Sequence, residues 1–208
     1  MITQRTVETF LNELAGAAPT PGGGSAAAII GAMGAALLSM VCNVTLGKKG
    51  QEAVEPDMKA VRDESERLRA RLTAMVAEDI AAFDGLMGAY RMPKTTDEEK
   101  SRRTEAIQSN LRAATETPLE CARACAEVVM LARRAAEKGF AGVISDAGVG
   151  VLAANSALRS AALNVYINAP SLKDRAYATA AATEVESLIE RCARESEAVF
   201  ELVRGRLG

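Results

Sequence analysis

The segment Pro19-Thr20-Pro21-Gly22-Gly23-Gly24-Ser25, followed by the apolar run Ala26–Leu46, decides the fold of this chain. Its prolines prevent a helix from starting earlier, and its glycines let the backbone bend sharply and approach other groups closely. Ser25 is a suitable N-cap for the helix that follows. Free N–H groups at a helix start also attract anions. The segment therefore predicts either a tight turn between helices or an anion-binding site.

The run Ala26–Leu46 is about long enough to span a membrane. Its many Ala and Gly residues would let neighbouring helices approach closely, and it carries the polar residues Ser39, Asn43 and Thr45. A helix that is apolar on all sides can also lie at the centre of a bundle. We therefore predict a buried core helix and no membrane contact.

Composition favours one helical domain over residues 1–208. Hydrophobic residues make up 49% of the chain but aromatic residues only 3%. Such a core is built from small and aliphatic side chains, which suits closely packed helices better than a β-sandwich. The net charge is −2 with both signs interspersed, so we expect no nucleic-acid partner.

The chain contains no histidine, which excludes a histidine-based triad and any histidine metal site. Acid–base chemistry must then come from Asp, Glu, Lys, Cys or Tyr. The four cysteines form no Cys-x-x-Cys motif; buried thiols are the favoured interpretation, and a four-thiolate zinc site is the alternative. The N-terminus has no signal-peptide pattern, which indicates the cytoplasm. We predict no metal and no cofactor.

Apolar spacing and capping signals predict an all-α, up-and-down bundle with two long helices. Thr96-x-x-Glu99 is a capping box, and Thr117-Pro118-Leu119-Glu120 is interpreted as a second helix start. Ser145-Asp146 and Ser171-x-x-Asp174 are interpreted as further starts. The helices are expected over residues 6–15, 25–46, 56–90, from 96, 117–139, 145–168, and from 171 to the C-terminal region.

Asp79 is the sharpest candidate for chemistry. It falls on the apolar seam of the helix over 56–90, between Val76 and Phe83. Carboxylates are seldom buried without a partner, because desolvation of the charge is costly. A buried ion pair or a polar contact between helices would explain the residue equally well. In a chain without histidine, a seam carboxylate is also the natural general acid or base.

Other polar residues have simpler explanations. Asp146 could complete a helix cap. Asn164 and Asn168 lie one turn apart on an otherwise apolar helix, where hydrogen bonds between helices are expected.

Several motifs together resemble the cyclodeaminase/cyclohydrolase family, which includes the cyclodeaminase domain of formiminotransferase-cyclodeaminase. They run in order through nearly the whole chain: Pro19 to Ser25, Met40-Val41, Thr45, Gly47-Lys48-Lys49, Glu78-Asp79-x-x-Ala82-Phe83, Pro93-Lys94-x-Thr96-x-Glu98-Glu99-Lys100, Ser145-Asp146 and Leu163-Asn164-Val165-x-Ile167-Asn168.

The resemblance implies an all-helical homodimer that binds tetrahydrofolate derivatives in a cleft. It implies that Asp79 is catalytic. The residues implied to bind the substrate are Gly22, Gly23, Gly24, Ser25, Lys48, Lys94, Ser145, Asp146 and Asn164.

The implied reaction is hydrolysis of 5,10-methenyltetrahydrofolate to 10-formyltetrahydrofolate. A carboxylate suits this chemistry, because it can stabilise the cationic substrate carbon, orient a water molecule and carry its proton. Asp79 is the first candidate and Asp146 a lesser one. Lys48, Lys94 or the glycine-rich helix start could hold the anionic glutamate tail. The alternatives are a formiminotetrahydrofolate cyclodeaminase that releases ammonia, and a folate-binding helical dimer without activity.

Overall fold

The structure is a computed structural model that describes residues 5–207. Every regular element in that part of the chain is helical, so the all-α expectation is confirmed. Six α-helices run in the order α1 (Val7–Leu14), α2 (Gly23–Thr45), α3 (Glu55–Tyr90), α4 (Asp97–Lys138), α5 (Ile144–Asn168) and α6 (Arg175–Leu207). Short 3-10 turns at Glu52–Val54, Ala141–Val143 and Ala169–Ser171 precede α3, α5 and α6.

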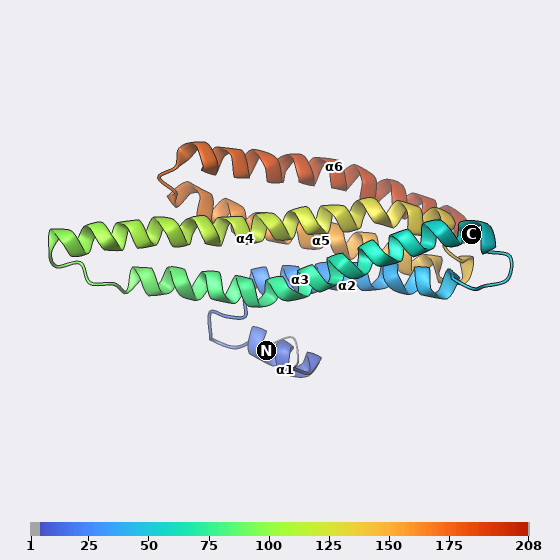
Figure 1. Cartoon of the computed structure of the whole chain (residues 1–208), viewed down its shortest axis with the longest axis horizontal. Coiled ribbons are helices and arrows are strands. Elements are labelled where there is room, and N and C mark those ends of the chain that lie inside the picture. The colour runs from blue at the N-terminus through green and yellow to red at the C-terminus, as the bar shows by residue number, and fades with distance from the viewer. Residues whose placement is uncertain (1–4, 208) are drawn as a thin grey trace.

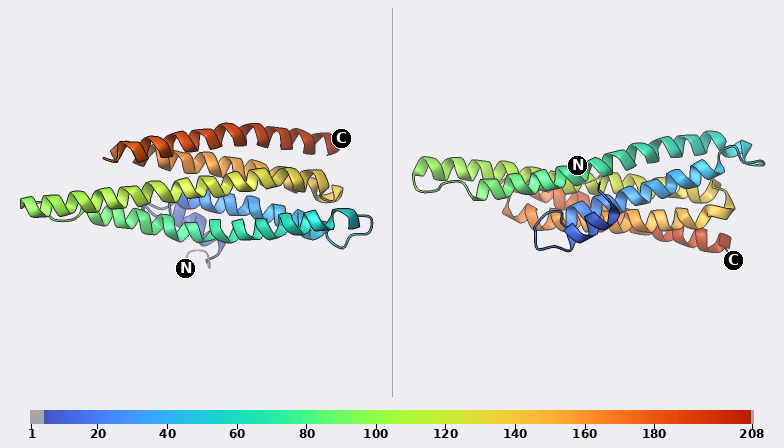
Figure 2. Two further views of the ribbon diagram at one scale, coloured as in Figure 1. Left: turned by 45° about the horizontal axis from the view of Figure 1, so that its top comes forward. Right: turned by 90° about the horizontal axis from the view of Figure 1, so that it is seen from below.

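Helices α2 to α6 lie side by side along the long axis, and each runs opposite to the helix before it (Figure 1, Figure 2). The longest are α3, with 36 residues, and α4, with 42. Their connection extends past the other helices at one end of the bundle (Figure 1). Helix α1 lies outside the bundle beside α2, across an apolar groove of about 620 Å³. The up-and-down bundle is as predicted, although more than two of its helices are long.

Helix α2 contributes one side to the core of the bundle. It packs against both α3 and α5. Helices α2 and α5 are long and apolar enough to cross a membrane, but 61% of the apolar stretch of α2 is buried inside the protein. Gly34 of α2 touches the backbone of α5 at Gly150. Both apolar helices are core helices, in agreement with the sequence interpretation.

The apolar seam of α3 faces this core as expected. Met58, Val61, Leu68 and Leu72 are fully buried. Further along the same seam the burial is less complete, and Tyr90 is 42% exposed. In the last third of α3 one side still packs, with Leu86 buried in a small cluster with Leu111 and Ala114, and the other side borders open space.

The prediction that a new helix starts at Thr117-Pro118 is wrong. Helix α4 continues through Pro118, which is buried in its interior. A proline has no N–H, so the carbonyl of Ala114 loses its partner within the helix. The side-chain amide of Asn168, on α5, donates to that carbonyl at 2.7 Å. This contact between helices makes an interior proline tolerable.

The predicted helix starts have mixed outcomes. The capping box is confirmed, because Thr96 Oγ1 accepts from the Glu99 N–H and the Glu99 carboxylate returns to the Thr96 N–H. Ser25 is not the N-cap of α2: Gly22 is, and Ser25 lies in the first turn. Helix α5 begins at Ile144 after Val143, without a side-chain cap.

The last helix begins later than predicted. Ser171 closes a 3-10 turn, and Asp174 Oδ1 accepts from the Tyr177 N–H at 3.0 Å, so Asp174 itself caps α6.

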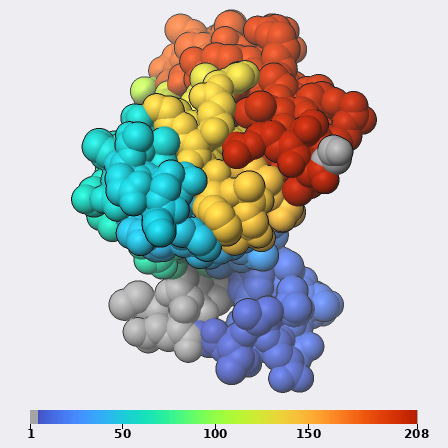
Figure 3. Space-filling view, turned by 90° about the vertical axis from the view of Figure 1, so that its right-hand side faces the viewer, coloured from blue at the N-terminus to red at the C-terminus, as the bar shows by residue number. Residues whose placement is uncertain are grey.

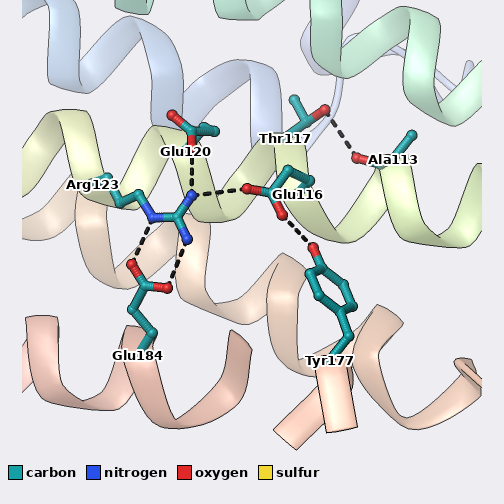
Figure 4. A network of polar contacts seen from close by, with 7 residues as sticks. All are labelled: Ala113, Glu116, Thr117, Glu120, Arg123, Tyr177 and Glu184. Carbon is teal, nitrogen blue, oxygen red and sulfur yellow. Dashed lines mark hydrogen bonds and ion pairs between the residues drawn. The ribbon is translucent and has the colours of Figure 1, made fainter. Parts of the chain in front are cut away.

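A network of charged side chains joins α4 to α6 (Figure 4). The guanidinium of Arg123 binds both carboxylate oxygens of Glu184 at 2.6 Å, and it also contacts Glu116 and Glu120 on its own helix. Tyr177 of α6 donates to the other oxygen of Glu116. Bidentate geometry makes such pairs stronger than single contacts. The network fixes α6 against the middle of α4.

Candidate active site

The glycine-rich turn brings α2 into direct contact with Asp79 on α3. Ser25 is fully buried, and its hydroxyl donates to Asp79 Oδ2 at 2.8 Å. Its first-turn position points the hydroxyl sideways at the neighbouring helix. The predicted polar contact between helices is therefore present, and its partner is uncharged.

Gly24 leaves the space that the Asp79 carboxylate occupies. A Cβ atom built on Gly24 would overlap the carboxylate, at 2.6 Å from Asp79 Cγ. The neighbouring Gly23 has nothing within 4 Å of the same position. Only one of these two glycines is needed for the carboxylate to approach α2.

Burial is the main influence on the pKa of Asp79. Burial raises the pKa of Asp79 above its ordinary value, and hydrogen bonds from the Ser25 side chain and backbone act against that rise. Among residues 5–207 no Lys or Arg forms an ion pair with Asp79. A raised pKa makes the ionised carboxylate a better proton acceptor than a solvent-exposed aspartate.

Asp79 lines a cleft of about 360 Å³ between α3, α4 and the end of α5. The α3 wall is apolar and aromatic, and the opposite wall carries amides and hydroxyls. The lining residues are Asp79, Ala82, Phe83, Leu86, Met87, Tyr90, Leu111, Ala114, Thr117, Asn164, Ile167, Asn168 and Ser171. An apolar surface with a few polar groups and one carboxylate with a shifted pKa is the usual form of a small-molecule site.

The comparison with known sequences identifies the family. The family model of formiminotransferase-cyclodeaminase matches residues 6–187.

The chain belongs to the formiminotransferase-cyclodeaminase family.

Relatives of two architectures match this family member. It is 55% identical to the methenyltetrahydrofolate cyclohydrolase of Methylorubrum extorquens, with 100% of both chains covered. It is 30% identical to the formimidoyltransferase-cyclodeaminase of Rattus norvegicus, and the match covers 97% of this chain but 37% of that protein. The crystal structure of formiminotetrahydrofolate cyclodeaminase from Thermotoga maritima superposes with a TM-score of 0.83 at 28% identity, covering 97% and 98% of the two chains.

The site residues expected from the family resemblance fall into separate places. Asn164 lines the cleft together with Asp79, and the glycine-rich turn lies beside it. Lys94 is exposed in the connection between α3 and α4. One group of the expected residues therefore meets around Asp79, and the others do not.

Lys48 follows the last turn of α2, and Ser145 and Asp146 lie in the first turn of α5. These two segments meet at the end of the bundle that faces the viewer in Figure 3, in cyan and gold. The ammonium of Lys48 stands 3.5 Å from the centre of the Phe140 ring. From Ser25 to the end of α2 is about 30 Å of helix, and from Asp146 to Asn164 about 27 Å. Within one copy of this family member these residues do not share the cleft of Asp79.

Sequence reasoning missed the aromatic wall of the cleft. Phe83 and Tyr90 have the spacing of core residues, yet both line the cleft. One signal of the cleft was present in the sequence. Pro118 has no N–H, so a backbone carbonyl of the same helix needs a hydrogen-bond donor from elsewhere. That partner, Asn168, shows which helix lies across the cleft.

The interpretation of the cysteines as buried thiols is confirmed. All four are buried and free. In the described residues no group of three His, Cys, Asp or Glu side chains lies close enough to hold a metal ion.

Proposed function

We propose that this chain hydrolyses 5,10-methenyltetrahydrofolate to 10-formyltetrahydrofolate, with Asp79 as the acid/base. The name of the relative that is 55% identical over its full length supports the reaction. The observation that carries the residue assignment is a half-buried carboxylate that lines a cleft and is held by a neutral hydroxyl. A carboxylate locked in an ion pair would have supported a structural role instead.

The proposed chemistry follows from the charge on the substrate. Its reacting carbon lies between two nitrogens and is cationic, so a nearby carboxylate stabilises it and attracts a water molecule. As the water oxygen bonds to this carbon, Asp79 accepts one of the water protons. Asp79 then returns that proton to the departing nitrogen, and the carbon–nitrogen bond breaks. The second water proton leaves to solvent as the formyl carbonyl forms.

The cleft offers separate surfaces for the two parts of the substrate. The Phe83 and Tyr90 wall can pack against flat aromatic rings. Asn164 and Thr117 can form hydrogen bonds with ring nitrogens and oxygens. We propose that the glycine-rich turn and Lys94 help to bind the glutamate tail, because backbone N–H groups at a helix start and an exposed ammonium both attract anions. A role for Lys48, Ser145 or Asp146 in the same site would require a second copy of the chain.

We also propose that the chain forms a homodimer in the cytoplasm. The support is an apolar surface, defined by Val7 on α1, Met33 on α2 and Val149, Leu163 and Ile167 on one face of α5, with exposures between 54% and 76%. Exposed apolar surfaces of this kind commonly mark interfaces. Sedimentation equilibrium should give twice the chain mass, and Leu163→Asp should give a monomer. A monomeric unmodified chain at micromolar concentration would contradict the dimer.

The decisive assay for the activity is the near-ultraviolet absorbance of methenyltetrahydrofolate, compared with its spontaneous hydrolysis at the same pH. We expect fast enzyme-dependent loss, with 10-formyltetrahydrofolate as the product. Asp79→Asn should reduce kcat by at least about a hundredfold, the typical size of a general acid/base contribution, while substrate binding persists. Near-normal turnover by a folded Asp79→Asn variant would reject the catalytic assignment.

One alternative activity has a specific observation in its favour. The Thermotoga maritima protein with the same fold is a formiminotetrahydrofolate cyclodeaminase. If methenyltetrahydrofolate is not consumed, formiminotetrahydrofolate should be offered and ammonia measured. Ammonia release would assign the cyclodeaminase, and binding without either product would leave a folate-binding helical protein.

A further inference from the structure

We propose that Ser25 and Gly24 are positioning residues for Asp79: Ser25 holds the carboxylate through its hydroxyl, and Gly24 leaves the space in which the carboxylate sits. This inference rests on the proposed function, because it concerns the same acid/base group. It changes the expected role of Ser25, which the family resemblance implied to be substrate binding.

Burial separates positioning from substrate contact. Ser25 has no exposed surface, and its hydroxyl already donates to Asp79 Oδ2 at 2.8 Å. A substrate in the cleft would meet Asp79 and not the serine behind it. The hydrogen bond from its hydroxyl to one carboxylate oxygen limits rotation of the carboxylate plane. Ser25 therefore acts through Asp79.

Gly24 supplies the second half of the arrangement. Any side chain at this position would collide with the carboxylate, because even a Cβ would lie 2.6 Å from Asp79 Cγ. The glycine lets α2 and α3 approach until the Ser25 hydroxyl reaches Asp79. Without that approach the hydrogen bond could not form at its present length.

Few other charges act on Asp79, so the hydrogen bond has a measurable effect on its titration. Helix α2 contains no Asp, Glu, Lys or Arg, and no charged group contributes to the shifted pKa of Asp79. The other titratable group in the cleft lining is Tyr90.

The neighbouring charges are either paired with one another or exposed to solvent. On α3, Glu78 pairs with Arg71, and Asp84 is exposed. On the α1 side, Arg5 and Glu13 pair with each other near Ala77. The Ser25 hydroxyl is the principal group that favours the ionised carboxylate.

The first test is the pH profile of Ser25→Ala, with the spontaneous reaction subtracted at every pH. Removing the donor disfavours the ionised carboxylate, so the acid limb of kcat/KM should move to higher pH. At the plateau kcat should fall about tenfold, the equivalent of one hydrogen bond to a charged group, with KM little changed.

Ser65→Ala is the matched control. Ser65 is also fully buried, and its hydroxyl has no hydrogen-bond partner within residues 5–207. This variant should keep the wild-type acid limb and kcat. If Ser25 had only a structural role, Ser25→Ala would also keep the wild-type acid limb and kcat, and only its stability would change.

The second test replaces Gly24. Gly24→Ala displaces the carboxylate and should lower kcat about a hundredfold, the scale of a misplaced catalytic group. Gly205→Ala is the control, because nothing lies within 4 Å of a Cβ at that helical position. Circular dichroism and substrate binding should confirm that each variant is folded.

The outcomes distinguish this inference from the proposed function. If Asp79→Asn is inactive while Ser25→Ala keeps the wild-type acid limb and kcat, positioning by Ser25 is rejected and the catalytic role of Asp79 stands. If Asp79→Asn stays active, the proposed catalytic residue itself is rejected. A shifted acid limb in Ser25→Ala, with the limb unchanged in Ser65→Ala, would support the inference.

Discussion

Gly34 on α2 and Gly150 on α5 cross with their backbones in contact: a Cβ on Gly34 would lie 2.8 Å from the carbonyl oxygen of Gly150. A backbone carbonyl cannot turn aside as a flexible side chain can. Gly34→Ala should therefore push the two core helices apart and lower the free energy of unfolding by about 1–3 kcal/mol. Urea denaturation, with Gly205→Ala as the open-space control, checks this. Equal stability of the two variants would contradict it.

The Arg123 network predicts a stability that depends on pH. Hydrogen bonding to Arg123 lowers the pKa of Glu184 below its ordinary value of 4.5. The contribution of Glu184 is thus present above that value and is lost as the pH falls through the lowered pKa. Arg123→Met should cost about 1–2 kcal/mol at neutral pH, less than a fully buried pair. The difference from the wild type should shrink in acid.

Arg69→Met is a suitable control for Arg123→Met. Arg69 pairs with Glu66 on the exposed surface of α3, with 47% of its side chain exposed. Such pairs contribute about 0–0.5 kcal/mol. Denaturation at several pH values should separate the two variants, and equal losses would show that the network adds no more than a surface pair.

Asp79→Asn should be more stable than the wild type at neutral pH. Burial raises the pKa of Asp79 from its ordinary value of 3.8, so its favourable contribution is complete below that value and is lost as the pH rises through the raised pKa. Asparagine removes the buried charge and can still accept from Ser25. The melting temperatures should converge in acid and diverge toward pH 7. A less stable variant at pH 7 would contradict this reasoning.

Asn164→Ala should weaken substrate binding more than turnover. The amide nitrogen of Asn164 donates to the Ser160 carbonyl at 3.2 Å, which directs the amide oxygen to accept from a ligand in the cleft. Loss of one such hydrogen bond should raise KM about tenfold. Asn155→Ala, on the same helix but outside the cleft, is the control. A larger effect on kcat than on KM would instead place Asn164 at the reacting atoms.

Local signals in the sequence predicted the features that depend on neighbours along the chain. The Thr96–Glu99 capping box and the α3 seam from Met58 to Leu72 formed as expected, because a cap or a helical face is defined within a few residues. The all-α bundle follows from the same short-range patterns.

The features that sequence reasoning missed depend on contacts between distant residues. Ser25 looked like an N-cap, but its partner is Asp79, and Pro118 looked like a helix start, but Asn168 satisfies the backbone beside it. Ser25 and Asp79 are 54 residues apart, and so are Asn168 and Ala114, whose carbonyl it satisfies. Motif order also cannot show position along the bundle, so Lys48 was grouped with Asp79 although Asp79 contacts the start of α2 and Lys48 follows its end.

Pro118, inside α4, determines how α4 and α5 are aligned on either side of the cleft. Carbonyls in the interior of a regular helix normally accept from an N–H of the same helix, but the carbonyl of Ala114 lacks that donor and accepts from Asn168 instead. This hydrogen bond fixes the register of α5 relative to α4. A shift of α5 by one helical turn would break it. The position of Asn164 relative to the Asp79 carboxylate thus depends on the missing N–H of Pro118. In the sequence Pro118 is 39 residues from Asp79 and 46 residues from Asn164.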